Sequence, residues 1–171
     1  MKKALITGAT RGIGRAIAEE LGKDHHVIAG ASRDAAGVVD KLPSAEPFEV
    51  DLRDPAAIRE AVRGIEELDV LVLNAGVLHK GPFEELDDDI WRATLDLNLL
   101  APVILTRELL PALRRSNGLI IAINSGAGFH GVPEHSAYCA SKFALKGFTD
   151  TLALEEKGAV RLHVRDSHPL R

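Results

Sequence analysis

The stretch KALITGATRGIG, residues 3–14, joins a short apolar run to a turn that carries three glycines. Residues 3–7 predict a buried strand, and residues 15–22, with apolar side chains on one side, predict a helix. Gly8, Gly12 and Gly14 lie between them in Gly-x3-Gly-x-Gly spacing. Glycines let a backbone turn sharply and approach a pyrophosphate, whose charge the first N–H groups of a helix can bind. Strand, glycine-rich turn and helix together predict the first βα unit of a dinucleotide-binding fold.

The rest of the chain repeats this alternation of strand and helix. Further strands are predicted at 26–31, 48–50, 70–73, 118–124 and 160–164, and helices at 55–67, 88–115 and 136–157, with a short helix within 34–46. Residues 70–73 form a continuous apolar run, which is typical of a parallel strand covered on both faces. We therefore predict an α/β fold, a Rossmann-type doubly wound parallel sheet in the order 3-2-1-4-5-6. Helices should cover both faces through right-handed crossovers, in a single domain over residues 1–171.

The predicted helix 88–115 contains Pro102, whose ring lacks the N–H that a helix interior needs. We therefore expect a kink or a break at this position. Asn98 lies just before it and is expected to find free backbone groups or water. The three aspartates at 87–89 are interpreted as charges that complement the dipole at the start of the helix, rather than as metal ligands.

Composition narrows the classes of partner. The chain has 171 residues and a net charge of -4, which does not favour nucleic acid as a general partner. No apolar run approaches the roughly 20 residues needed to span a bilayer, and the apolar stretch after the first three residues is too short for a signal peptide. The single Cys139 excludes an intrachain disulfide, and the histidines do not cluster with metal-ligand spacing. We expect a cytoplasmic protein with no metal, no membrane and no nucleic-acid partner.

Side chains near the predicted glycine turn bear on which nucleotide binds. A carboxylate at the end of the second strand would hydrogen-bond the ribose hydroxyls of NAD. Here Ser32 occupies that place, Arg33 follows it, and Arg11 lies in the glycine turn. Because a guanidinium group is a rigid fork of donors that suits a 2′-phosphate, these residues favour NADP over NAD. The alternative is that both arginines are solvated surface groups.

A second motif, SAYCASK at residues 136–142, places a phenol and an amine on one predicted helix. Tyr138 and Lys142 are four residues apart and therefore share a face. The reference pKa of tyrosine is about 10, and a nearby ammonium group favours the phenolate and lowers that pKa. The pair is thus a candidate acid/base for moving a proton to or from an oxygen. Taken alone, the same spacing also describes a half-buried ring beside a solvated lysine.

Taken together, these motifs resemble the short-chain dehydrogenase/reductase family in its Tyr-x3-Lys form. The matching residues occur in the family's order over about residues 3–162. They are Thr7-Gly8-x3-Gly12-Ile13-Gly14, Asp51, Asn74-Ala75-Gly76, Asn98, Ser125 and Tyr138-x3-Lys142. The resemblance implies an NAD(P)-binding oxidoreductase that transfers hydride between NADP(H) and a small-molecule carbonyl or alcohol substrate, with NAD a less favoured cofactor.

The resemblance also implies a role for each matching residue. Tyr138 would act as the acid/base, and Lys142 would lower its pKa and hydrogen-bond the nicotinamide ribose. Ser125 would donate to the carbonyl oxygen, and Asn98 would hold a water that links Lys142 to solvent. The expected cofactor-binding set is Gly8, Thr10, Arg11, Gly12, Ile13, Gly14, Ser32, Arg33, Asp51, Leu52, Asn74, Ala75, Gly76, Tyr138 and Lys142, with Asp51 and Leu52 beside the adenine.

The last residues depart from the family's pattern. Similar proteins continue past the sixth strand with a Pro-Gly turn, a nicotinamide-binding threonine, a mobile substrate lid and a last strand. Here residues 167–171 read SHPLR, with Leu170 where the glycine is expected. We therefore expect the last strand and the lid of the family to be missing, and the identity of the substrate to lie beyond this sequence.

Two other functions are compared with this one. A catalytically silent NADP-binding or scaffold protein is suggested by the departure at the end, and opposed by the presence of all four catalytic residue types. An epimerase-like relative that acts on nucleotide sugars usually has Gly-x2-Gly-x2-Gly spacing, which this chain lacks. The helix 136–157 is apolar around much of its circumference, so we expect a homodimer or homotetramer through the helices near 88–115 and 136–157.

Overall fold

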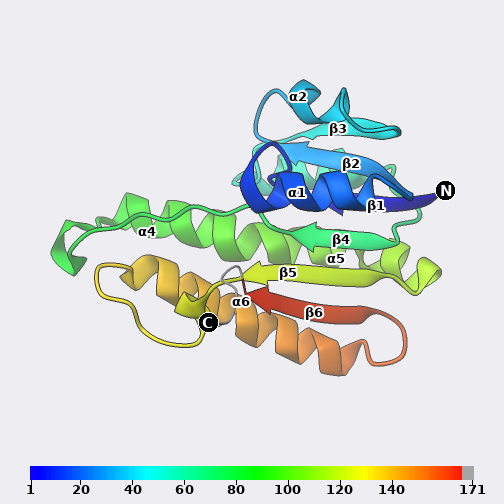
Figure 1. Ribbon diagram of the computed structural model, residues 1–171. Coiled ribbons are helices and arrows are strands. Elements are labelled where there is room, and N and C mark those ends of the chain that lie inside the picture. Colours follow the sequence, from blue (N-terminus) through cyan, green and yellow to red (C-terminus); the bar gives the residue numbers. More distant parts are fainter. Residues whose placement is uncertain (167–171) are drawn as a thin grey trace.

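Six parallel strands form one sheet in the order β3-β2-β1-β4-β5-β6. This is the order that the sequence predicts. The computed structural model describes residues 1–166 (Figure 1), so the predictions about Leu170 and the missing lid fall outside the described residues. The strands are β1 (Lys2–Ile6), β2 (His25–Ala31), β3 (Ala45–Glu49), β4 (Val70–Leu73), β5 (Leu119–Asn124) and β6 (Arg161–Asp166).

Helices pack on both faces of this sheet, as predicted. One face carries α1 (Gly12–Leu21) and α2 (Ala36–Val39), and the other carries α3 (Pro55–Val62), α5 (Ala101–Ser116) and α6 (Ser136–Glu155). Side chains alternate along each strand, so Ala4 and Ile6 of β1 pack with the α1 cluster while Leu5 packs with the larger cluster beneath α5. Because both faces are covered, inner strands such as β4 and β5 read as apolar runs rather than as alternating ones.

The third strand starts earlier than the sequence suggests. It spans Ala45–Glu49 rather than 48–50, and it includes Pro47, which cannot donate a hydrogen bond to a sheet ladder. The strand tolerates this proline because β3 is at the edge of the sheet and pairs with β2 alone. The short helix expected within 34–46 is α2.

The long helix predicted at 88–115 is three elements. It consists of α4 (Asp88–Leu95), a π-helical turn η2 (Asp96–Leu100) and α5. Pro102 cannot donate to the carbonyl of Asn98 four residues earlier, so the regular ladder cannot run through this point. The expected break is confirmed, and Asn98 lies inside the distorted turn, buried.

The remaining helix ends show how local chemistry sets the boundaries. The Asp54 carboxylate accepts hydrogen bonds from the N–H groups of Ala56 and Ala57 and so begins α3, as predicted. That helix ends at Val62 rather than near 67 because Gly64, a poor helix former, follows its last turn. Asp87 begins α4 by accepting from the N–H of Ile90. No helix among residues 1–166 is both long enough and apolar enough to cross a membrane.

Candidate active site

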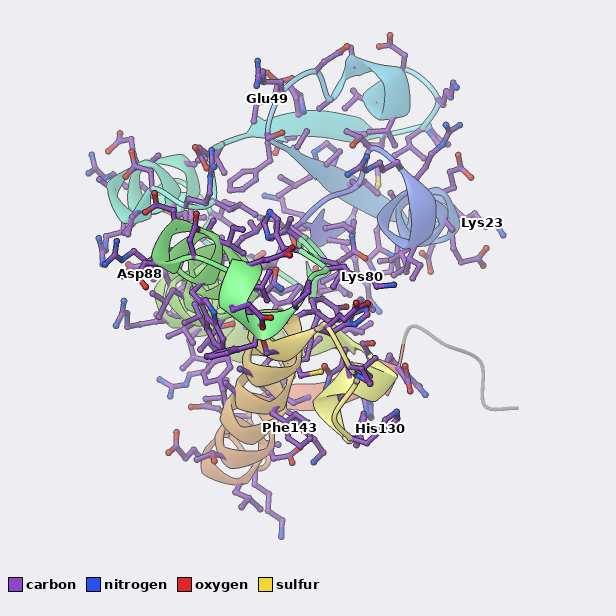
Figure 2. The ribbon with its side chains drawn as sticks, turned by 90° about the vertical axis from the view of Figure 1, so that its left-hand side faces the viewer. Lys23, Glu49, Lys80, Asp88, His130 and Phe143 are labelled. Carbon is purple, nitrogen blue, oxygen red and sulfur yellow. The ribbon has the colours of Figure 1, made fainter. Side chains whose placement is uncertain are left out.

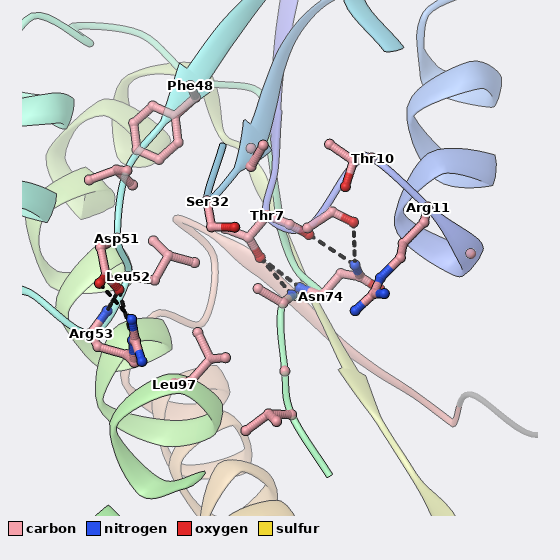
Figure 3. Close-up of a pocket in the computed structure, with 18 of the residues that line it drawn as sticks. Thr7, Thr10, Arg11, Ser32, Phe48, Asp51, Leu52, Arg53, Asn74 and Leu97 are labelled. Carbon is pink, nitrogen blue, oxygen red and sulfur yellow. Dashed lines mark hydrogen bonds and ion pairs between the residues drawn. The ribbon is translucent and has the colours of Figure 1, made fainter. Parts of the chain in front are cut away.

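A cleft of about 890 Å³ opens at the carboxyl ends of β1, β2 and β4 (Figure 3). Ligands of open α/β sheets bind at this edge, beside the point where the strand order reverses. Most of the residues predicted to bind the cofactor line it. They are Gly8, Thr10, Arg11, Gly12, Ile13, Ser32, Asp51, Leu52, Asn74, Ala75 and Gly76. Arg33 is exposed and is not among the lining residues, and Gly14 is buried behind the turn.

The glycine turn is held in place from β4. Asn74 donates from Nδ2 to the backbone oxygens of Thr7 (2.9 Å) and Gly8 (3.1 Å). The hydroxyl of Thr7 in turn accepts from the N–H groups of Asn74 and Ala75. A side chain at Gly14 would not fit, because its β-carbon would lie 2.1 Å from the oxygen of Gly8. The turn and the end of β4 are therefore one interlocked unit, which sets the floor of the cleft.

The amino end of α1 faces this cleft without a side-chain cap. Arg11 is the N-cap residue, its side chain makes no capping bond, and the first turn carries no acidic residue. Gly12 has a φ of +55°, and a β-carbon at this position would meet nothing within 4 Å. Free N–H groups at a helix start and an open backbone beside them suit a phosphate. This part of the chain thus fits the pyrophosphate of a dinucleotide.

The far end of the cleft carries an ion pair. Arg53 binds the Asp51 carboxylate through two nitrogen atoms, at 3.0 and 2.8 Å (Figure 3). These hydrogen bonds lower the pKa of the Asp51 carboxyl and raise that of the guanidinium. Both side chains are exposed, so the pair is open to a ligand. The sequence analysis did not identify Arg53 as a cleft residue, although it follows Asp51 by only two positions.

A smaller cavity of about 190 Å³ adjoins the large cleft. Four residues line both of them, namely Ile13, Asn74, Gly76 and Val77. The remaining lining comes from Leu78 in the loop after β4, from Ile123 and Asn124 of β5, and from Tyr138 and Lys142 of α6. The structure therefore places the predicted acid/base pair next to the predicted cofactor site.

Ser125, Tyr138 and Lys142 come together from two elements. Ser125 follows β5 and begins the 3-10 turn η3 (Gly126–Gly128), where its hydroxyl accepts from the N–H of Ala127. Tyr138 and Lys142 lie one turn apart on α6, and the Tyr138 hydroxyl is hydrogen-bonded to Ser125. The Nζ of Lys142 lies 5.6 Å from the centre of the tyrosine ring and donates to the backbone oxygen of Ile123 at 2.9 Å.

The pKa of the tyrosine differs from the sequence prediction. Burial raises the pKa of Tyr138 above its ordinary value of 10.0, and the hydrogen bond from Ser125 offsets part of that rise. Lys142 is not among the causes of this shift, so its lowering of the pKa of Tyr138 stays a prediction for the cofactor-bound protein. Burial lowers the pKa of Lys142 itself from 10.5 to about 8, because an ammonium group is less stable away from water. Its Nζ is also directed at the Ile123 carbonyl rather than at the phenol.

Asn98 connects the π-helical turn to its surroundings. Its Nδ2 donates to the backbone oxygen of Val77 and to the hydroxyl of Ser141, and its Oδ1 accepts from the N–H of Val77. Ser141 in turn donates to the backbone oxygen of Tyr138 at 2.7 Å. These bonds tie the loop after β4 to the helix that carries the acid/base pair. Ser141 is a residue that the sequence analysis missed.

Comparison with known proteins matches this arrangement to one family. The family model described as short chain dehydrogenase matches residues 2–165. The chain is 35% identical over 166 residues to a 3beta-hydroxysteroid dehydrogenase from Mediterraneibacter gnavus (strain ATCC 29149), an alignment that covers 90% of this chain and 60% of that protein. It spans between 57% and 66% of the length of the first curated relatives compared.

Solved structures give the same result. A metagenomic short-chain oxidoreductase in complex with NADP superimposes with a TM-score of 0.91 at 35% identity, covering 99% of this chain and 83% of that one. A 4-hydroxyisoleucine dehydrogenase complexed with NADH does so with a TM-score of 0.88 at 32% identity, covering 97% and 74%. The strand order, the glycine turn and these matches agree, and the chain belongs to the short-chain dehydrogenase family.

Proposed function

We propose that this chain is an oxidoreductase that transfers hydride between NADP(H) and a carbonyl or alcohol substrate. The observation that carries the proposal is the position of the Tyr138 hydroxyl. It is hydrogen-bonded to Ser125 and lies one helical turn from the buried Lys142, beside a cavity that adjoins the dinucleotide-sized cleft. The names of relatives, which include dehydrogenases and reductases, support the same reaction class.

The cofactor, when bound, would supply or accept the hydride. In the direction of reduction, the carbonyl carbon gains a C–H bond and the carbonyl oxygen takes the proton of the Tyr138 hydroxyl. Ser125 would donate a hydrogen bond to the same oxygen as negative charge develops on it. Burial raises the pKa of Tyr138, so the phenol of the protein alone holds its proton at neutral pH, and this is the form that can donate a proton in the direction of reduction.

Lys142 and Asn98 would assist this step without contacting the carbonyl group themselves. On binding a nicotinamide ribose, the Nζ of Lys142 would exchange the Ile123 carbonyl for ribose hydroxyl groups. Its ammonium group would then lie nearer the phenol and favour the phenolate that remains after proton transfer. Asn98 would hold the loop after β4 in place against α6. A water beside Asn98 would return a proton to the tyrosine through Lys142.

NADP rather than NAD is part of the proposal. Arg11 and Ser32 line the cleft, and a second cationic side chain, Arg53, lies at its far end. No carboxylate follows directly after β2, where NAD would need one. The structural relatives include both an NADP complex and an NADH complex, so the preference of this chain depends on its own residues.

The surroundings of the site complete the proposal. Two exposed apolar side chains, Leu100 of η2 and Phe143 of α6, suit a contact with a second copy of the chain. Figure 2 labels Phe143. We therefore propose a homodimer or homotetramer, which light scattering would measure.

The reduced, buried Cys139 suits a cytoplasmic location. Residues 1–171 would act as a single domain.

The experiment is an assay of NADPH oxidation with a panel of ketones and aldehydes. We expect wild-type turnover, and we expect Tyr138→Phe to lower the rate by about 10²- to 10⁴-fold while NADPH binding is retained. Equal rates for the two proteins would reject the role of the tyrosine. NADPH binding without turnover on any substrate would instead favour a silent, NADP-binding protein.

A further inference from the structure

The side chain of Asn124 is buried without a hydrogen-bond partner. Asn124 is the last residue of β5 and is 1% exposed. Neither its Nδ2 nor its Oδ1 has a partner in the structure. Buried amide atoms are paired in most proteins, since leaving them unpaired costs free energy on folding. An unpaired amide at the carboxyl end of a central strand therefore calls for an explanation.

The place of Asn124 in the fold, beside a cavity, points to a ligand. Asn124 lines the smaller cavity together with Tyr138 and Lys142. That cavity shares four lining residues with the large cleft, so one elongated ligand can occupy both. If the uncapped start of α1 holds the pyrophosphate, the half of the dinucleotide that reaches the acid/base pair must enter the cavity that Asn124 lines.

The neighbouring turn leaves space for the amide. A β-carbon at Gly128 would lie 2.6 Å from both Nδ2 and Oδ1 of Asn124. Thr106 and Ser136 also carry buried, unpaired hydroxyl oxygens, but neither of them lines the two cavities. Asn124 is thus the residue at which an unpaired polar group and a ligand cavity coincide among those described.

We propose that the Asn124 amide binds the ribose–nicotinamide half of the cofactor. The inference rests on the proposed function and deepens it by assigning a binding residue that none of the expected motifs contains. An asparagine amide offers two donors and one acceptor oxygen, so it can pair with a group that both donates and accepts. The ribose hydroxyls and the carboxamide of the nicotinamide are both of this kind.

The test compares three nucleotides by isothermal titration calorimetry. They are NADPH, 2′-phospho-ADP-ribose, which lacks the nicotinamide, and 2′,5′-ADP, which lacks the whole second half. Asn124→Leu replaces the amide by an apolar group of similar size. We expect it to weaken NADPH binding roughly tenfold and to leave 2′,5′-ADP binding unchanged. Loss of 2′-phospho-ADP-ribose affinity would assign the contact to the ribose, and its retention would assign the contact to the carboxamide.

The control variant is Thr106→Val, which removes another buried and unpaired oxygen away from the cavities. It should leave all three affinities unchanged. Unaltered NADPH affinity in Asn124→Leu would overturn the proposal and leave Asn124 as the site of a structural water. A matching loss for NADPH and 2′,5′-ADP would also overturn it, because the effect would then be a general one on folding.

Two further measurements keep the test decisive. If Asn124→Leu does not fold, Asn124→Ala makes the same comparison without the larger side chain. A wild-type protein that binds NADPH but turns over no substrate would refute the proposed function and leave the Asn124 contact standing. Wild-type protein that binds neither NADPH nor 2′,5′-ADP would overturn both.

Discussion

Replacing Lys142 by methionine should change how stability depends on pH. Lys142 is 5% exposed, and burial lowers its pKa from 10.5 to about 8. Between these two values the unfolded chain binds a proton that the folded chain does not bind, so the stability of the wild type rises with pH in this window. The whole difference corresponds to about 3 kcal/mol. Below about pH 8 the folded protein carries the buried ammonium group, and this contribution to stability is absent.

The assay is urea unfolding of the wild type and of Lys142→Met, without cofactor, at several pH values between about 7 and 10. Methionine keeps most of the apolar stem and carries no titrating group. The free energy of unfolding of the wild type, relative to the variant, should rise by about 2.5 kcal/mol over this range. The variant also loses the hydrogen bond to the Ile123 oxygen, which lowers its stability by an amount that varies little with pH. The test is therefore how the difference in unfolding free energy changes with pH.

The matched control is Lys157→Met, a change at an exposed lysine just beyond α6. The difference in unfolding free energy between the wild type and Lys157→Met should not change over the same pH range, because the side chain of Lys157 is exposed to water in the folded chain as well as in the unfolded one. A flat difference for Lys142→Met as well would refute the reasoning. It would mean that water reaches the Lys142 amine, and that the enclosed site around the acid/base pair does not exist.

Two further predictions concern the glycine turn and the cofactor preference. Gly14→Ala should destabilise the protein by about 2–3 kcal/mol in urea unfolding, because its β-carbon would clash with the Gly8 oxygen. Gly147→Ala, within α6 and with open space around it, should instead stabilise by about 0.5–1 kcal/mol; similar effects of both changes would contradict the packing argument. Arg11→Ala should weaken NADPH binding about tenfold more than NADH binding. Arg33→Ala should change this preference for NADPH less than Arg11→Ala does, because Arg33 does not line the cleft. Equal losses of NADPH and NADH affinity in Arg11→Ala would reject the NADP assignment.

Local patterns predicted much of this molecule, because they depend on neighbours in the chain. The apolar run and the glycine spacing of residues 3–14 predicted the first strand, the turn and the helix. The interval from Tyr138 to Lys142 placed both side chains on one face, since helical pitch alone fixes that relation. Pro102 marked the break next to Asn98, because a missing N–H interrupts any helix. The strand order was predicted as that of a Rossmann-type fold, whose crossovers are right-handed.

Other properties depended on residues far apart in the sequence, so only the tertiary structure could decide them. The hydroxyl of Thr7 holds the start of the loop after β4, and Asn98 reaches Ser141, 43 positions away. The pKa values of Tyr138 and Lys142 are set by how deeply packing buries them, and no spacing rule reports the depth of burial. The sequence determined which chemical groups are present and which share a face; the folded packing decided which of them are shielded from water, and therefore in which direction their pKa values move.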